Sequence, residues 1–287
     1  MIAHIAHADE QRGRVVLWLG GSGEAHDTAV DAALRLAQAF ESEIESLFIE
    51  DCQLYDLAEL PFAREISLSG RRTRAFSAAS LAKDMQAHAA ALQRSVLARA
   101  RAADVKVQTR VVRAEPIQAL AQACAENGPW NVVTVGTPIG QGNMGVAEIF
   151  DTVHATTGIV VTGPKAQRTS GPVIAVVEEL ERLVPMMRAA ERIATATGGD
   201  ARLWLLEHDQ ARQDWIEGQI RLALSPSPNI KFDVVDMSIH TPLDVARLMR
   251  RQRAGFVIAR FGGVLAPHED GVAPFAEALD GPLFLVR

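Results

Sequence analysis

The alternation of short apolar runs with helical patterns constrains this chain most, because it limits how strands can pair. The first run, Val15–Leu19, ends in glycines and is followed by apolar residues spaced by one helical turn. Further runs at Ile44–Ile49, Val105–Val112, Val132–Val135 and Ile159–Val161 also alternate with helical patterns. Strands separated by helices pair in parallel, and continuously apolar strands fit a sheet that is covered on both faces. The first part of the chain therefore predicts a five-stranded parallel sheet.

The same order of elements begins again after the polar Pro164–Gly171 segment. The strands expected in this second copy are Val173–Val177, Ala201–Leu206, Ile230–Val235, Phe256–Ala259 and Leu283–Val286. The two copies keep their register on both sides of one gap, which makes the second copy shorter by about 34 residues between its second and third strands. We predict an α/β fold with two tandem, doubly wound parallel five-stranded sheets, in domains at residues 1–165 and 166–287.

Composition and charge exclude several classes of partner. The 287 residues are 48% hydrophobic and carry a formal net charge of −6, so a nucleic-acid partner is not expected. An arginine cluster at Arg64, Arg71, Arg72 and Arg74 is the best candidate for a local basic patch, and a solvated loop is the preferred interpretation of it. The N-terminus lacks the apolar region of a signal peptide, and no apolar run approaches the length of a membrane span. We expect a cytoplasmic protein without a membrane partner.

A glycine-rich segment follows the fourth strand of the first copy. It contains Gly136, Thr137, Gly140, Gly142, Asn143 and Gly145, and a helix is expected to begin near Val146. Glycines let the backbone approach a phosphate closely, and a helix N-terminus presents free N–H groups. The spacing formally matches a dinucleotide fingerprint, but that motif belongs after the first strand of a unit. The alternative interpretation is a flexible turn that binds nothing.

We find no motif for catalysis or for a metal site. The chain contains no nucleophile elbow and no zinc-protease helix, and its two cysteines are far apart. Glu50 and Asp51 lie at the carboxyl end of a strand, where open α/β sheets bind ligands, and there they are either ligand contacts or a charged strand end. We therefore predict no catalytic residues and no metal, and we favour a protein that is not an enzyme.

Three segments resemble the universal stress protein family, in which tandem copies are a familiar form. They are the glycine-rich segment from Gly136 to Gly142, the Leu47–Asp51 strand end and the Arg113–Pro116 turn. The resemblance implies the universal stress protein fold, which is of the adenine-nucleotide alpha-hydrolase-like type, and an adenine nucleotide, ATP or AMP, in the first copy. The residues that it assigns to this ligand are Gly20, Gly21, Ser22, Ala114, Gly136, Thr137, Gly140, Gly142, Asn143 and Gly145.

The sequence also departs from the family pattern. Members that bind ATP carry an Asp after the first strand, where this chain has Gly20-Gly21-Ser22. In the second copy, Glu178 and Glu179 follow the first strand and Arg260 ends the fourth, so we expect no phosphate there. The resemblance implies a stress-response or regulatory protein. A ligand-free interaction module and, less favoured, a weak ATP-hydrolysing enzyme remain as alternatives.

We expect the two copies to pack together as an internal pseudo-dimer. Pairing the fifth strands, Ile159–Val161 and Leu283–Val286, would remove two exposed sheet edges. A homodimer of the whole chain and an unidentified protein partner are also open. The Pro61–Phe76 segment, which mixes apolar residues with arginines, is a candidate lid or partner surface.

Overall fold

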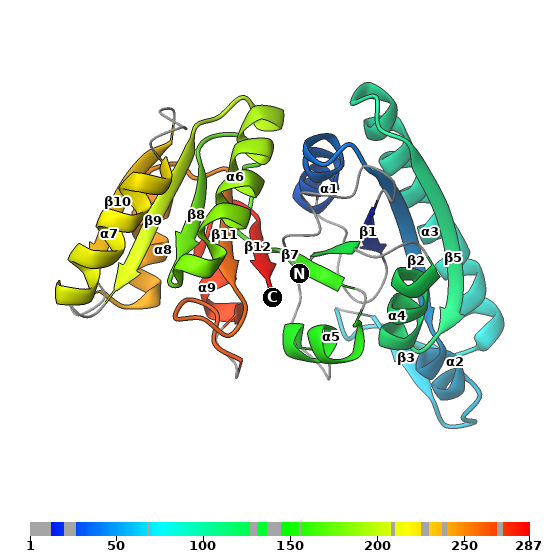
Figure 1. Cartoon of the computed structure of the whole chain (residues 1–287). Helices are drawn as coiled ribbons and strands as arrows, with labels where there is room; N and C mark the ends of the chain where they lie inside the picture. Colours follow the sequence, from blue (N-terminus) through cyan, green and yellow to red (C-terminus); the bar gives the residue numbers. More distant parts are fainter. Residues whose placement is uncertain are drawn as a thin grey trace.

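The structure is a computed structural model. It describes residues 13–19, 27–67, 69–126, 131–136, 145–154, 156–207, 210–224, 230–236, 240–268 and 272–287. Ten strands form one sheet in the order β10-β9-β8-β11-β12-β7-β6-β1-β2-β5, with helices on both faces (Figure 1).

The two halves of this sheet repeat one topology. The elements of the first copy are β1 (Arg14–Leu19), α1 (Asp27–Ala39), β2 (Glu43–Asp51), α2 (Cys52–Ala58), β3 (Arg64–Ile66), β4 (Thr73–Ala75), α3 (Ala78–Ala102), β5 (Val107–Ala114), α4 (Pro116–Glu126), β6 (Asn131–Gly136), α5 (Val146–Thr152) and β7 (Thr156–Thr162). The elements of the second copy are β8 (Val173–Val177), η2 (Leu180–Arg182), α6 (Leu183–Thr197), β9 (Ala201–Glu207), α7 (Gln210–Leu224), β10 (Lys231–Asp236), α8 (Pro242–Arg251), β11 (Phe256–Arg260), α9 (Val272–Ala278) and β12 (Leu283–Val286).

Each copy contributes five parallel strands, which confirms the predicted fold class. The strand order is β5-β2-β1-β6-β7 in the first copy and β10-β9-β8-β11-β12 in the second. The register repeats as well, because Phe48 pairs with Val111 as Leu205 pairs with Val234. The two parallel halves are not separate sheets, since they join edge to edge into one mixed sheet. The division into domains at residues 165 and 166 falls between β7 and β8 and stays a prediction.

The fifth strands form the seam, by which we mean the antiparallel pairing of β7 with β12. Val160 lies opposite Phe284, and these two residues occupy equivalent places in the two copies. Equivalent residues face each other only across a two-fold axis, so the seam has the geometry of an isologous dimer interface within one chain. Helices α1 and α6 pack against each other over it, and the Arg35 guanidinium donates to the carbonyl of Ala196 at 3.4 Å. The predicted choice of fifth strands is confirmed.

Two apolar cores lie on the two faces of the sheet. One contains the buried faces of α1, α3, α6 and α7, and the other those of α4, α5, α8 and α9. The central strands between them are buried on both faces. All seven residues of β7 and all five of β8 are buried, as expected for parallel strands with helices on each side.

The structure differs from the sequence prediction at two segments. The stretch before α3 contains helix α2 and the β3–β4 hairpin, where an irregular segment was expected. Asp51 begins α2 as its N-cap, since its carboxylate accepts from the Gln53 N–H at 2.9 Å. Helix α7 was also not predicted, and its weak apolar periodicity explains why. Among the described helices, none combines the length and the apolar character that a membrane span requires.

Candidate functional site

The predicted ligand site lies at the carboxyl edge of the first five strands. Because β1, β2, β5 and β6 are parallel, their carboxyl ends meet at one edge. Ala114 is the last residue of β5, Gly136 the last of β6, and Gly145 the N-cap of α5. The other predicted ligand residues, Gly20, Gly21, Ser22, Thr137, Gly140, Gly142 and Asn143, lie outside the described residues.

The indole N–H of Trp18 is a buried hydrogen-bond donor near the same edge. The indole of Trp18 lies one residue before the end of β1, on the face that α4 and α5 cover. Its N–H is buried and has no hydrogen-bond acceptor among the described residues. A buried donor usually has a partner, so this side chain is a candidate ligand contact that the sequence reasoning missed. A tryptophan in an apolar strand carries no sequence signal for such a role.

Glu50 and Asp51, the two acids at the end of β2, have separate structural roles. Asp51 caps α2, and Glu50 is only 4% exposed. The Glu50 carboxylate accepts from the Tyr55 hydroxyl at 2.8 Å and from Nε of Arg113 at 3.0 Å. Burial and this hydrogen bond raise the pKa of Tyr55. Glu50 is therefore an anchor for neighbouring side chains and not a free ligand for a hydroxyl group.

Arg113 is the cation that Glu50 anchors at this edge. Its guanidinium carbon lies 3.7 Å from the centroid of the Tyr55 ring, and its side chain is 49% exposed. The hydrogen bond that Arg113 donates to Glu50 raises the pKa of Arg113, so the guanidinium stays charged. A fixed and half-exposed guanidinium that lies on an aromatic ring is suited to an anionic or planar ligand. Arg113 precedes Ala114, which places it beside a predicted ligand residue.

The equivalent edge of the second copy carries charged side chains that interact with other residues of the same copy. Glu178 follows β8 where Gly20 follows β1, because Val15 and Val173 hold the same register position. The backbone N–H of Val264, in the turn after β11, donates to the Glu178 carboxylate at 3.0 Å. Arg260, the equivalent of Gly136, forms an ion pair with Glu179. That the second copy takes no phosphate stays a prediction.

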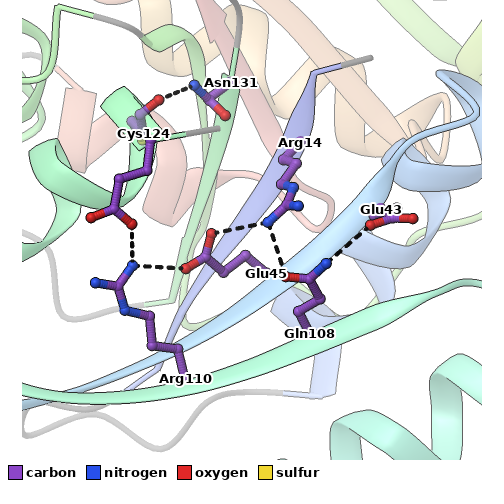
Figure 2. Close-up of polar contacts among 8 residues, drawn as sticks. Arg14, Glu43, Glu45, Gln108, Arg110, Cys124 and Asn131 are labelled. Atoms are coloured by element: carbon purple, nitrogen blue, oxygen red, sulfur yellow. Dashed lines mark hydrogen bonds and ion pairs between the residues drawn. The ribbon is translucent and has the colours of Figure 1, made fainter. Parts of the chain in front are cut away.

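A further charged network lies toward the amino ends of β1, β2 and β5, away from the candidate site. Figure 2 shows Glu45 between Arg14 and Arg110, each at 3.7 Å, and Arg110 also pairs with Glu126 at 2.6 Å. Glu45 is 3% exposed, and this burial raises the pKa of its carboxyl group although both arginines act to lower it. Its place at the edge opposite the ligand edge indicates a structural role. The apolar character of the strand around Glu45 hid this network from the sequence prediction.

The described residues contain no group of three or more His, Cys, Asp or Glu side chains that could hold a metal ion. Within the same part of the chain, Cys124 is buried in α4 and Cys52 is partly exposed at the start of α2. The described part of the carboxyl edge consists of backbone, Arg113, the aromatic side chains of Trp18 and Tyr55, and the carboxylates of Glu50 and Asp51.

Comparison with known proteins supports the fold at low sequence identity. No family model matches the chain, and no curated protein matches it. A universal stress protein from Archaeoglobus fulgidus has a similar structure, with a TM-score of 0.61, 13% identity, and coverage of 96% of this chain and 97% of that one. A protein of unknown function from Pseudomonas aeruginosa PAO1 matches with a TM-score of 0.56, 13% identity, and coverage of 100% and 94%.

A third similar structure is the cytoplasmic domain of a prokaryotic cation chloride cotransporter. It has a TM-score of 0.54 and 10% identity, and the match covers 96% of this chain and 95% of that domain. At these identities the likeness establishes the fold alone, because one fold serves many functions.

The fold defines an α/β protein made of two copies of a doubly wound domain. The chain has the universal stress protein fold in its tandem form.

Proposed function

We propose that this chain is a stress-response or regulatory protein that binds an adenine nucleotide, ATP or AMP, in its first copy. The observation that supports the proposal is that Ala114 ends β5 and Gly136 ends β6 at the carboxyl edge of one parallel sheet, and that Gly145 begins helix α5. The glycine-rich segment between Gly136 and Gly145 would supply backbone N–H groups to phosphates. Trp18 and Arg113 would add a donor and a cation.

The proposal includes one nucleotide per chain and no catalysis. A phosphate entering the second copy would meet Glu178, which already accepts from the turn after β11. Within the described residues we find no cluster for a metal ion, and the sequence lacks the lysine of a phosphate-binding loop. In this proposal the second copy serves as the partner in an internal pseudo-dimer, and the protein works in the cytoplasm.

Calorimetric titration of the full chain with ATP, ADP and AMP tests this function. We expect one site per chain for at least one of the three nucleotides. Gly140→Val should abolish binding, because a branched side chain would block close approach of the backbone to phosphate. Gly218→Ala is the matched control, since a Cβ at Gly218 in α7 meets nothing within 4 Å. Absence of binding by the wild-type chain, or equal binding by both variants, would contradict the proposal.

A ligand-free interaction module is the second candidate, and one surface favours it. Phe62 is 75% exposed and Ile66 is 64% exposed, both close to the exposed β3–β4 hairpin. Large apolar side chains grouped on a surface often mark an interface. If the wild-type chain binds no nucleotide, this candidate becomes the preferred function.

A further inference from the structure

We propose that Glu178 is a built-in anion of the second copy, which replaces a ligand there and holds the turn Phe261–His268 in place against helix α5 of the first copy. In the second copy, the Glu178 carboxylate would then occupy the place of a ligand at all times, and this copy would support the ligand-binding first copy. The part of this proposal that concerns nucleotide affinity rests on the proposed function. The part that concerns the turn does not.

The repeat between the copies shows that Glu178 contacts the counterpart of the glycine-rich segment. Thr134 pairs with Val160 as Ile258 pairs with Phe284, so the turn after β11 corresponds to the glycine-rich segment after β6. Val264 lies in this turn, four residues after the end of β11. The Glu178 carboxylate therefore accepts from a backbone N–H of the second copy's turn. In the first copy, the corresponding segment is the one that we propose for phosphate.

The turn is shaped closely around the carboxylate. Besides the bond from the Val264 N–H, a Cβ at Gly263 would lie 2.6 Å from Oε2 of Glu178, so a side chain there would have to displace the carboxylate. Burial raises the pKa of Glu178, while the Val264 N–H and the nearby Arg260 act to lower it. Glu178 is half-buried, and its carboxylate accepts directly from the backbone of the turn.

The same turn makes the contact with the first copy. The Gly262 N–H donates to the carbonyl of Ala266 at 2.7 Å, and the His268 imidazole covers Gly262, which has a φ of 79°. The Phe261 ring packs edge-on against His268, with centroids 4.7 Å apart. It also stacks on Phe150 of α5, at 4.5 Å and 28° between the ring planes.

These contacts form one continuous path between the copies. It runs from Glu178 through the turn to Phe261 and then to Phe150, which is 1% exposed. Helix α5 follows the glycine-rich segment of the first copy directly. A loosened turn would therefore remove a packing partner from the helix whose first residues border the proposed ligand.

Hydrogen exchange measured on the full chain tests the role of Glu178. In Glu178→Ala, we expect exchange of amides in the 261–268 segment to be about tenfold faster than in the wild type, because the turn loses a charge-assisted hydrogen bond. Sodium formate should restore part of the protection, whereas sodium chloride at equal ionic strength should not. Glu178→Gln, which keeps an acceptor oxygen, should lie between the wild type and Glu178→Ala.

Glu179→Ala is the matched control, because it removes a neighbouring carboxylate that pairs with Arg260 and does not accept from Val264. Unchanged protection in Glu178→Ala, an equal loss in Glu179→Ala, or restoration by chloride as much as by formate would each overturn the proposal.

Nucleotide titration of Glu178→Ala and Phe261→Ala tests the coupling between copies. We expect both variants to bind the nucleotide several-fold more weakly than the wild type, with one site still filled. Wild-type affinity in both variants would overturn the coupling. Failure of the wild-type chain to bind any nucleotide would overturn the proposed function instead, and the hydrogen exchange result would still decide whether Glu178 holds the turn.

Discussion

The seam can be tested at Gly158, a residue of β7 that leaves no room for a side chain. A Cβ there would lie 2.5 Å from Cε2 of Phe284 and 2.7 Å from the carbonyl oxygen of Leu285. The ring edge can shift, but the carbonyl belongs to β12, whose position is fixed by its pairing with β7 and β11. Gly158→Ala must therefore either displace a central strand or compress the contact between the two copies.

The expected magnitude follows from two opposing effects. Overpacking a well-packed site costs about 1–3 kcal/mol. Replacing glycine by alanine lowers the conformational entropy of the unfolded chain, which offsets about 0.4–1 kcal/mol of that cost. We expect Gly158→Ala to reduce the free energy of unfolding by about 1–2 kcal/mol, close to a tenfold change in the unfolding equilibrium.

Urea unfolding followed by far-ultraviolet circular dichroism measures this difference. Gly218→Ala is the control, because a Cβ at this exposed position of α7 would meet nothing within 4 Å. It should be neutral or stabilising. If Gly158→Ala is as stable as Gly218→Ala, then β7 and β12 are not packed as closely as described, and the reasoning about the seam is wrong.

Two further predictions concern buried groups. Burial raises the pKa of Glu45, so the folded state binds the carboxyl proton of Glu45 more tightly than the unfolded chain does. Once the pH exceeds the pKa values of Glu45 in both states, ionised Glu45 lowers the free energy of unfolding. Glu45→Gln should accordingly gain stability relative to the wild type as the pH rises from about 4.5 to about 7.5, and a constant difference in thermal-unfolding series would count against it. Burial also raises the pKa of Cys124 to about 12, so a thiol reagent at about pH 8 should leave Cys124 unmodified until the chain unfolds, and its rapid labelling in the native protein would refute its burial.

Much of the fold was predictable because it depends on local patterns. Apolar runs between helical patterns placed the ten strands of the main sheet, and Val173–Val177 and Leu283–Val286 agree with the structure residue for residue. The repeat was visible because equivalent strands keep the same spacing. The short α2 and the β3–β4 hairpin were missed, since they have few buried residues and so leave little periodic signal.

The candidate site was predictable only as a location. Parallel strands imply a shared carboxyl edge, so the places of Ala114 and Gly136 followed from the strand order. The role of Glu50 could not be predicted from the strand order. Whether Glu50 contacts a ligand or bonds to neighbouring side chains depends on where Tyr55 and Arg113 lie. The assignment of ligand residues and of the nucleotide remains a prediction.

The sequence alone determined that the chain builds one parallel α/β unit twice, because strand and helix periodicity reflects which side of each element is buried. Only the tertiary structure decided how the two units meet and what closes the second one. The pairing of Val160 with Phe284, the stack of Phe150 on Phe261 and the bond from Val264 to Glu178 each join residues far apart in the chain. Such contacts depend on the relative placement of packed elements, which no local pattern of residues records.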